Sequence, residues 1–335
     1  MTTEADPGGI YHGSRALVLG ASGFIGRWVA RRLSQAQATV TVAIRDLSAY
    51  EGVAQAWGIR AQAIELDSLD AASVERAIHE TTPDIVFNLV GYGVDRGEVD
   101  TDLMWRINRD LVRHTATALS RTVPSKTWSG GRRLVHVGSA LEYGLMEGVA
   151  REDRPPVAHT EYGRSKLEGT AVLAEVAAAT GLNAVTGRLF TVYGPGEHPG
   201  RLLPTIRRAA IDGTVVRLTA GTQCRDFSYV DDVAEGLIRL GASFGVPGEA
   251  INVAAGRMTS VRDFAQTAAQ VLHLPGDRLQ FGAEEVRPDE MRISGVAVDR
   301  LKARTGWEMA AGLENGLSRA ARFEDELAGD LPQQS

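Results

Sequence analysis

Cysteine is nearly absent from this chain of 335 residues, because Cys224 is its only one. A single thiol cannot close a disulfide within the chain, which excludes a small disulfide-stapled fold and favours a cytoplasmic protein. The first residues lack a cationic patch followed by an apolar run, and no stretch reaches about 18 consecutive apolar residues. We therefore expect neither a signal peptide nor a transmembrane helix.

Positive charge is the scarcer sign, since Lys and Arg number 36, Asp and Glu number 42, and the formal net charge is −6. No basic block is present, so the broad electrostatic footprint of a nucleic-acid-binding protein is missing. The histidines show no ligand spacing such as His-x-x-x-His, so no metal site is expected. The expected partners exclude nucleic acid and membranes, and any anionic ligand must be held by a local cluster of arginines.

Hydrophobic residues make up 44% of the chain and charged residues 23%, which is the profile of a globular protein. Short β-branched runs alternate with helical patterns. Strands are predicted at 16–19, 39–44, 59–66, 85–90, 134–137 and 183–189, and helices at 26–35, 73–79, 101–121 and 161–179. This order favours an α/β fold with a doubly wound parallel sheet, for which seven strands would fit.

The rhythm of strands and helices changes after Tyr193, which predicts two lobes for a chain of this length. Residues 1–13 are polar and are expected to form a flexible arm. Residues 14–193 hold the predicted sheet. Residues 194–330, where Gly, Pro and Arg interrupt shorter segments, are assigned to a smaller mixed α/β C-terminal lobe, within which the chain is free to return to the sheet.

A glycine-rich turn, Gly20-x-x-Gly23-x-x-Gly26, lies between the first predicted strand and the first predicted helix. Glycines there let the backbone approach a pyrophosphate at the positive end of a helix. The residues assigned to this cofactor site are Gly20, Ser22, Gly23, Phe24, Ile25 and Gly26 in the turn, Asp67 after the third strand for the adenine amino group, and Leu89 at the fourth strand. The alternative is a turn with a purely structural role.

The end of the second strand distinguishes the two nicotinamide dinucleotides. A ribose 2′-hydroxyl is usually held by an acidic residue there, whereas a 2′-phosphate needs a cation. The position 24 residues after Gly20 is Ile44, which is apolar, and Arg45 follows it. We therefore expect NADP(H) to be preferred and NAD(H) to be possible. In the alternative interpretation, Arg45 is a solvated surface residue and Asp46 holds the ribose.

Four residues are predicted to be catalytic. Tyr162 and Lys166 are four apart, so on a helix they share a face, and a neighbouring ammonium favours the phenolate form of a tyrosine. Ser139, at the end of a strand, is placed to hydrogen-bond the reacting oxygen. Asn108, on the preceding long helix, is expected to support the Lys166 side. A Tyr and a Lys also fall four apart by chance in many helices, so the order of all four residues carries the hypothesis.

The chain resembles the extended short-chain dehydrogenase/reductases, in their nucleotide-sugar epimerase/dehydratase branch. The motifs that carry the resemblance are Gly20-x-x-Gly23-x-x-Gly26, Asn108, Gly138-Ser139-Ala-Leu-Glu142-Tyr143-Gly144, Tyr162-x-x-x-Lys166, Arg188-Leu-Phe-Thr191-Val-Tyr193-Gly194-Pro195 and Arg225-Asp226-Phe-Ser-Tyr229-Val-Asp231-Asp232-Val233. It implies an NADP-binding Rossmann domain over 14–193, a nucleotide-sugar-binding lobe over 194–330, and a homodimer through the helices bearing Asn108 and Tyr162. The expected partner is a nucleotide-diphosphate sugar.

The resemblance also implies contacts to that substrate. Arg225 and Arg287 are expected to bind the diphosphate, because arginine offers forked donors that match phosphate oxygens. Arg201 is a weaker candidate, and each arginine has the alternative role of a surface ion pair. Thr191 stands where many relatives have Asn, and Glu142 is assigned to the sugar side of the site.

Relatives that dehydrate sugars carry an acid pair, or at least a Glu, in the two positions after the active-site Ser or Thr. This chain has Ala140 and Leu141 there, which disfavours 4,6-dehydration, although Glu142 follows at once. Epimerase/reductases similar to GDP-fucose synthase use a Cys and a His where this chain has Leu141 and Gly196, so that combined activity is disfavoured too.

Two reactions remain, and a third hypothesis comes from another class. The favoured reaction is NADPH-dependent reduction of a 4-keto-6-deoxy nucleotide sugar with Tyr162 as proton donor. The alternative is C4 epimerisation with tightly held NAD, as in proteins similar to UDP-glucose 4-epimerase. Because a reductase draws on the NADPH pool, Ile44 and Arg45 favour the reductase. The remote alternative is a non-catalytic dinucleotide-binding regulator, which the presence of Tyr162 and Lys166 disfavours.

Overall fold

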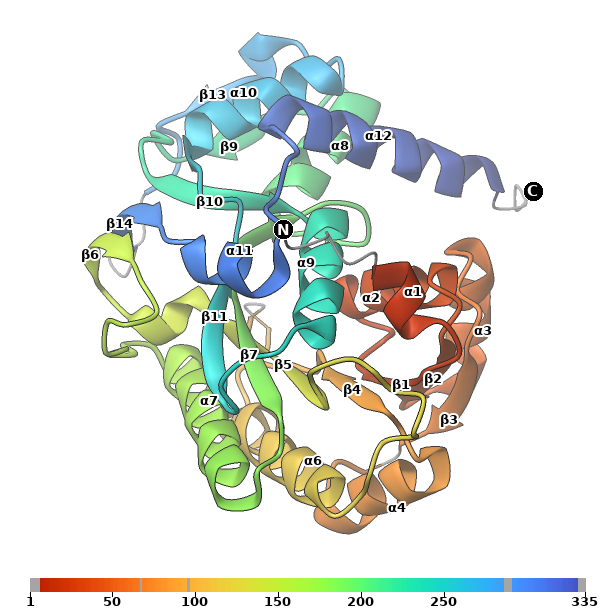
Figure 1. The fold of residues 1–335 in the computed structure, drawn as a ribbon. Helices are drawn as coiled ribbons and strands as arrows, with labels where there is room; N and C mark the ends of the chain where they lie inside the picture. Colours follow the sequence, from red (N-terminus) through yellow and green to blue (C-terminus); the bar gives the residue numbers. More distant parts are fainter. Residues whose placement is uncertain (1–6, 67, 95–96, 286–290, 331–335) are drawn as a thin grey trace.

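The computed structural model describes residues 7–66, 68–94, 97–285 and 291–330. A parallel sheet of seven strands forms its centre (Figure 1). In spatial order the strands are β11 (Glu249–Val253), β7 (Ala184–Leu189), β5 (Leu134–Ser139), β4 (Ile85–Asn88), β1 (Arg15–Leu19), β2 (Thr39–Ile44) and β3 (Gln62–Glu65). The central strands β4 and β7 are buried along their whole length, as expected of a sheet covered on both faces.

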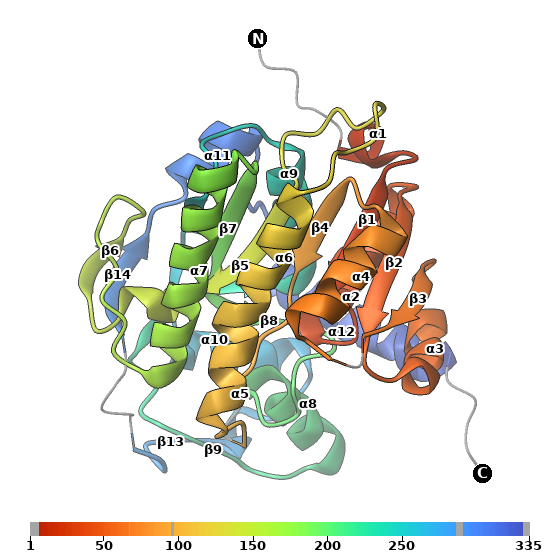
Figure 2. The same ribbon diagram turned by 90° about the horizontal axis from the view of Figure 1, so that it is seen from below.

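Helices cover both faces of this sheet (Figure 2). One apolar layer contains residues of α2 (Phe24–Gln35) and α9 (Val230–Ala242). The other contains residues of α4 (Ala71–Thr81), α6 (Leu111–Ser120) and α7 (Glu161–Thr180). A further helix, α3 (Leu47–Ala56), follows β2 and packs against β3. The predicted α/β fold with a doubly wound, Rossmann-type parallel sheet is thereby confirmed.

The long helix expected over 101–121 is divided into three parts. These are α5 (Thr101–Trp105), a π-helical turn η1 (Arg106–Asp110) and α6. The side chain of Asp100 caps the first part by accepting the Leu103 N–H. A π turn contains more residues per turn than an α-helix, so it changes the direction in which its side chains point. The residue at its centre is Asn108.

Smaller sheets and further helices form from the chain after β5. Their bounds are η2 (Ala140–Tyr143), β6 (Glu147–Ala150), β8 (Thr191–Tyr193), α8 (Leu202–Asp212), β9 (Val216–Leu218), β10 (Cys224–Tyr229), β12 (Met258–Ser260), α10 (Val261–Val271), η3 (Gly276–Arg278), β13 (Leu279–Phe281), β14 (Arg292–Val296), α11 (Asp299–Thr305) and α12 (Leu313–Asp330). β8, β10 and β12 form one sheet, β9 pairs with β13, and β6 pairs with β14. α9 and β11 return to the large sheet, while the domain boundary after residue 193 stays a prediction.

Ion pairs and aromatic rings join α12 and α9 to α2. Arg32 on α2 bonds Asp231 at 2.6 Å and Glu235 at 2.6 Å, and Arg319 on α12 bonds Asp231 at 2.6 Å. Phe323 on α12 lies with its ring centroid 4.7 Å from that of Trp28 on α2. The C-terminal helix is thus anchored directly on the first helix of the large sheet.

Residues 7–13, which were expected to belong to a flexible arm, contain a short docked helix, α1 (Pro7–Tyr11). Tyr11 is fully buried, its ring packs against Phe87 and Trp128, and its hydroxyl donates to the carbonyl oxygen of Ile238 at 2.8 Å. The polar composition of the segment concealed this one aromatic residue, whose burial offsets the entropy of ordering the short helix.

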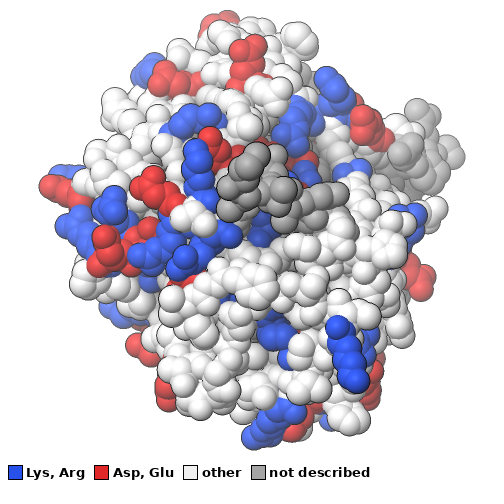
Figure 3. All heavy atoms as spheres, in the orientation of Figure 1, with Lys and Arg blue, Asp and Glu red and all other residues white. Residues whose placement is uncertain are grey.

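Charged side chains of both signs are interspersed on the face drawn in Figure 3, most densely over β6 and β14. This pattern agrees with the near balance of charges in the sequence. A search of the described helices for one long and apolar enough to cross a membrane finds none.

Replacing Tyr11 tests the docking of α1. Tyr11→Ala should lower the free energy of unfolding by about 3–5 kcal/mol, because it empties a buried aromatic site. Phe244, whose side chain is 68% exposed, provides the matched control, and Phe244→Ala should change stability by less than about 0.5 kcal/mol. Urea denaturation followed by circular dichroism measures both, and equal stabilities for the two variants would contradict the docked helix.

Candidate functional site

The glycine turn lies against the end of β4. Gly20 has a φ of +84°, and a Cβ there would come within 3.0 Å of the Leu89 carbonyl carbon. A Cβ on Gly26 would collide with the carbonyl oxygen of Gly20. Ser22 and Gly23 are exposed, and Gly23 precedes the first turn of α2, which holds no acidic residue. The turn therefore presents bare backbone and a positive helix end to an anion.

An arginine that sequence reasoning missed holds this turn in place. Arg27 donates from Nη2 to the carbonyl oxygen of Ser22 at 2.8 Å and from Nε to that of Gly23 at 3.2 Å. Its guanidinium stacks on Trp57, 4.8 Å from the ring centroid. The only sequence signal was its position directly after Gly26. Because its donors are directed at the turn's carbonyls, Arg27 fixes the backbone that would face a phosphate.

The end of β2 places Ile44 in the core and Arg45 on the surface. Asp46 caps α3, accepting the Ser48 hydroxyl at 2.7 Å and the Ala49 N–H at 3.1 Å through one oxygen. These hydrogen bonds, with that from Ser48 the largest, lower the pKa of the Asp46 carboxyl. Asp67, predicted to meet the adenine, lies outside the described residues. Leu89 is half-buried and stands beside the glycine turn.

The structure brings Ser139, Tyr162 and Lys166 together. Ser139 ends β5, and its Oγ accepts the Leu141 N–H at 3.2 Å. Tyr162 lies in the first turn of α7, and its hydroxyl shares a hydrogen bond with Ser139. Lys166, one turn further along α7, is 2% exposed. The geometry is that expected of a serine and a tyrosine that bind the same oxygen atom of a substrate.

Asn108 supports this group from the π turn. Its Nδ2 donates to the Tyr92 carbonyl oxygen at 2.8 Å and to the Ser165 hydroxyl at 2.9 Å, and its Oδ1 accepts the Tyr92 N–H at 3.2 Å. A Cβ on Gly169 would collide with the Asn108 carbonyl oxygen. Asn108 thus ties the segment after β4 to α7, while its predicted support of Lys166 stays a prediction.

Burial shifts two pKa values at the reaction centre. Burial raises the pKa of Tyr162 well above its usual 10, and this outweighs the hydrogen bond from Ser139. Burial also lowers the pKa of Lys166 to about 8, against the opposing charge of Glu142. The predicted stabilisation of a phenolate by Lys166 stays a prediction. Tyr162 is a protonated phenol near neutral pH, which suits a proton donor.

Glu142 corrects one expectation, since it was assigned to the substrate. Its side chain is fully buried, pairs with Arg188 at 2.8 Å, and accepts the Ser139 N–H at 2.7 Å. Because none of this side chain reaches the surface, its carboxylate is not exposed to a sugar in the site. The position of Glu142 in the chain indicated that it lies near Ser139 but not that it is buried.

Three other residues predicted to bind substrate lie outside the large sheet. Thr191 on β8 and Arg225 on β10 are both half-buried and lie on adjacent strands, where Thr191 pairs with Phe227. Arg201 precedes α8, and its charge lowers the pKa of Tyr162, which places it on the Tyr162 side of the site. Arg287 lies outside the described residues.

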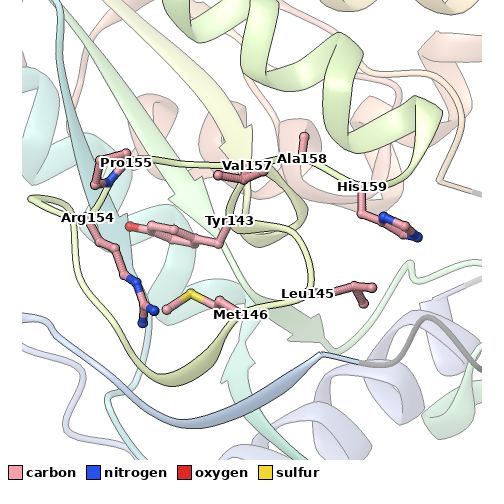
Figure 4. A pocket seen from close by; sticks show the side chains of 8 residues that line it. All are labelled: Tyr143, Leu145, Met146, Arg154, Pro155, Val157, Ala158 and His159. Carbon is pink, nitrogen blue, oxygen red and sulfur yellow. The ribbon is translucent and has the colours of Figure 1, made fainter.

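A cavity of about 320 Å³ lies beside the Ser139 and Tyr162 elements (Figure 4). The end of η2, the segment after it and the segment before α7 line it, through Tyr143, Leu145, Met146, Arg154, Pro155, Val157, Ala158 and His159. In Figure 4 the Arg154 and His159 side chains lie on opposite sides of the Tyr143 ring. No group of three or more His, Cys, Asp or Glu side chains that could hold a metal ion is found in the part of the chain that the structure describes.

Comparison with known proteins finds one family and many relatives. Residues 16–254 match the NAD dependent epimerase/dehydratase family. A UDP-glucose 4-epimerase of Azospirillum brasilense is 29% identical, over 92% of this chain and 90% of the relative. A dTDP-6-deoxy-L-talose 4-dehydrogenase (NAD(P)(+)) of Kitasatospora kifunensis is 25% identical, over 88% of this chain and 90% of the relative.

Solved structures share the fold. MoeE5 in complex with UDP-glucose and NAD matches with a TM-score of 0.77 and 26% identity, covering 92% of this chain and 98% of that one. A UDP-glucuronic acid 4-epimerase from Bacillus cereus in complex with NAD matches with a TM-score of 0.77 at 20% identity, over 96% and 99% of the two chains.

The residues of this chain fit a nicotinamide dinucleotide. Gly20 and Gly26 leave a cradle that a Cβ would fill, and the N-terminus of α2 is free of carboxylates in its first turn. The residues that would hold the pyrophosphate are the predicted ones from Gly20 to Gly26. Arg27 would support them through its hydrogen bonds to the carbonyl oxygens of the turn.

Substituting Gly26 tests this cradle. Gly26→Ala should weaken binding of NADPH and NADH at least about tenfold, because the added Cβ collides with the Gly20 carbonyl and distorts the turn. Gly52→Ala is the matched control, since a Cβ at that position in α3 meets nothing within 4 Å. Fluorescence titration gives each dissociation constant, and wild-type affinity in Gly26→Ala would argue against binding at this turn.

Proposed function

Because this chain belongs to the NAD dependent epimerase/dehydratase family, we propose that it reduces the 4-keto group of a nucleotide-diphosphate sugar with NADPH. It is an NAD(P)-dependent enzyme of the extended short-chain dehydrogenase/reductase type. The substrate class that we propose is a 4-keto-6-deoxy nucleotide sugar. The observation that carries this proposal is the arrangement at the end of β2.

At that point the cation is exposed and the carboxylate has a local role. Arg45 is exposed, while Asp46 caps α3 through one of its two oxygens. A ribose 2′-hydroxyl is usually held by an acidic residue there, whereas a 2′-phosphate needs a cation and gains from a nearby helix N-terminus. Arg45 beside the first turn of α3 therefore supports NADPH, the cofactor that a reductase consumes.

The reacting oxygen would be bound between Ser139 and Tyr162. NADPH, when bound, supplies the hydride that adds to the carbonyl carbon. Tyr162 donates its phenolic proton to the carbonyl oxygen, which becomes the hydroxyl of the product, and the raised pKa keeps that proton on Tyr162 until the oxygen gains electrons. Ser139 orients the oxygen, and the Lys166 ammonium favours the phenolate that remains.

The smaller lobe supplies the cations for the substrate. Arg225 and Arg287 are proposed to bind the diphosphate, with Arg201 before α8 as a weaker candidate and Thr191 as a polar contact. A chain with a net charge of −6 needs such local cations to hold a doubly charged group.

C4 epimerisation is the second candidate, and the relatives favour it. The Azospirillum brasilense relative is a UDP-glucose 4-epimerase, whereas the Kitasatospora kifunensis relative is a 4-dehydrogenase. The same Ser139, Tyr162 and Lys166 would serve an epimerase that keeps NAD bound and returns the hydride to the other face of the sugar.

We also infer a homodimer through the helices that bear Asn108 and Tyr162. α6 and α7 lie side by side on one face of the sheet (Figure 2). A hollow of about 660 Å³ runs along α5 and η1, lined by Asp102, Trp105, Arg106, Arg109 and Asp110.

Cofactor titration with an Arg45 variant distinguishes the two reactions. Arg45→Gln should weaken NADPH binding about tenfold or more, about 1.4 kcal/mol, and leave NADH binding unchanged. Arg76→Gln, which replaces an exposed arginine on α4, should change neither. Equal NADPH affinity in Arg45→Gln and wild type, with NAD retained through purification, would instead support the epimerase.

Tyr162→Phe tests the proton donor. It should keep the affinity for cofactor and lower the turnover rate by about a hundredfold or more, because the carbonyl oxygen loses its proton source. Reduction is measured as loss of NADPH absorbance with dTDP- and GDP-linked 4-keto-6-deoxy sugars. Tyr11→Phe, far from the site, is the control and should retain the wild-type rate. Near-normal turnover in Tyr162→Phe would remove Tyr162 from the reaction.

A further inference from the structure

A buried carboxylate lies directly behind the reacting groups. Glu142 on η2 is fully buried, and each of its oxygens accepts a hydrogen bond. Oε1 accepts the Ser139 N–H at 2.7 Å. Oε2 accepts Nε–H of Arg188 at 2.8 Å and the hydroxyl of Thr170 at 3.1 Å. The carboxylate therefore joins three elements, which are β5 through Ser139, β7 through Arg188 and α7 through Thr170.

These contacts set the spacing of the reaction centre. Thr170 lies one turn after Lys166 on α7, so Glu142 fastens the helix of Lys166 to the strand that ends in Ser139. Gly138 makes room for this, because a Cβ there would collide with Oε1 of Glu142. The glycine before the serine is thus explained by the carboxylate behind it.

Charge gives Glu142 a second effect. Lys166 is 2% exposed and Arg188 4% exposed, so two cations are buried close to a single carboxylate. Among the residues that the structure describes, Glu142 is the one whose charge favours the ammonium form of Lys166. The same charge favours the protonated form of Tyr162.

We propose that Glu142 is a positioning residue, whose carboxylate holds Ser139 to the helix of Tyr162 and Lys166 and supplies a buried negative charge that stabilises the Lys166 ammonium. This inference rests on the proposed function, because it assigns Glu142 a part in the same reaction. It replaces the contact with substrate that the sequence led us to expect.

Other titratable groups face the pair and act differently. They are Glu98 before α5, His136 on β5 and Arg201 at the N-terminus of α8. Glu98 raises and Arg201 lowers the pKa of Tyr162. His136 is fully buried, and burial first and the charge of Lys166 second hold its pKa well below the usual range. A neutral imidazole adds no charge to the site, which leaves the support of the ammonium to Glu142.

The composition of the chain permits a direct measurement. Lys166 shares the sequence with two other lysines, Lys126 and Lys302. Lysine labelled with carbon-13 at Cε therefore gives three NMR signals, and Lys166→Arg identifies the one to follow. Titrating the cofactor-free protein then reports the ionisation of Lys166 without any substrate.

The expected result is a downward shift. Glu142→Gln should lower the Lys166 midpoint from about 8 by about one pH unit, the scale expected of a nearby opposite charge. Glu142→Gln combined with Arg188→Met removes both charges of the buried pair together, which keeps the fold if the single variant loses it. This double variant should show a smaller shift in the same direction, because loss of the Arg188 cation offsets part of the effect. Glu168→Gln, which replaces an exposed carboxylate on α7, is the matched control and should leave the midpoint unchanged.

Two outcomes overturn the proposal. One is a Lys166 midpoint in the Glu142 variants equal to that of the wild type. The other concerns the pH dependence of sugar reduction. In the wild type, the turnover rate should fall as pH rises through the pKa of Lys166, and in the Glu142 variants this fall should begin at a lower pH. A fall at the same pH in the variants and the wild type would overturn the proposal. A merely structural residue would lower the turnover rate equally at every pH. If the wild type reduces no nucleotide sugar, the proposed function fails, and the lysine titration still decides the role of Glu142.

Discussion

The parallel direction of the seven strands is the constraint on which the site depends. Adjacent strands run in register, so that Leu19 of β1 pairs with Asn88 of β4, and Asn88 pairs with His136 of β5. Ser139 pairs in the same way with Leu189 of β7. The carboxyl ends of β1, β4, β5 and β7 therefore meet at one edge of the sheet, where open α/β sheets bind their ligands. Residues more than a hundred positions apart become neighbours there without any special contact.

Burial of charge at that edge sets the chemistry. Lys166, Arg188 and Glu142 all lie below the surface, where an unpaired ion is costly and a paired one is acceptable. Burial lowers the pKa of Lys166 to about 8 and raises that of Tyr162. The protein by itself holds a protonated phenol next to an ammonium that titrates close to neutral pH. A protonated phenol is the form of tyrosine that can donate a proton to an oxygen that gains electrons.

Sequence reasoning predicted the parts of the fold and the site that are local in the chain. These parts are the glycine turn, the spacing of Tyr162 and Lys166, and the alternation of strands and helices. Each involves residues close together in the sequence, so local patterns predict them. The π turn around Asn108 left no mark in the periodicity. The pairing of Glu142 with Arg188 spans 46 positions, and no local pattern shows that two such side chains are buried together. Tyr11 was missed for the same reason, because its partners lie far along the chain.

Reduction and epimerisation require the same groups around the reacting oxygen, so Ser139, Tyr162 and Lys166 alone do not distinguish them. The two reactions differ in whether the cofactor leaves after each turnover. In the proposed function, that difference depends on the adenosine end, where Arg45 is exposed and Asp46 caps α3. The glycine turn itself is held by Arg27 and Trp57, on which Phe323 of α12 also packs. We therefore propose that residues at the first helices of the sheet, away from the atoms that react, determine the choice of reaction.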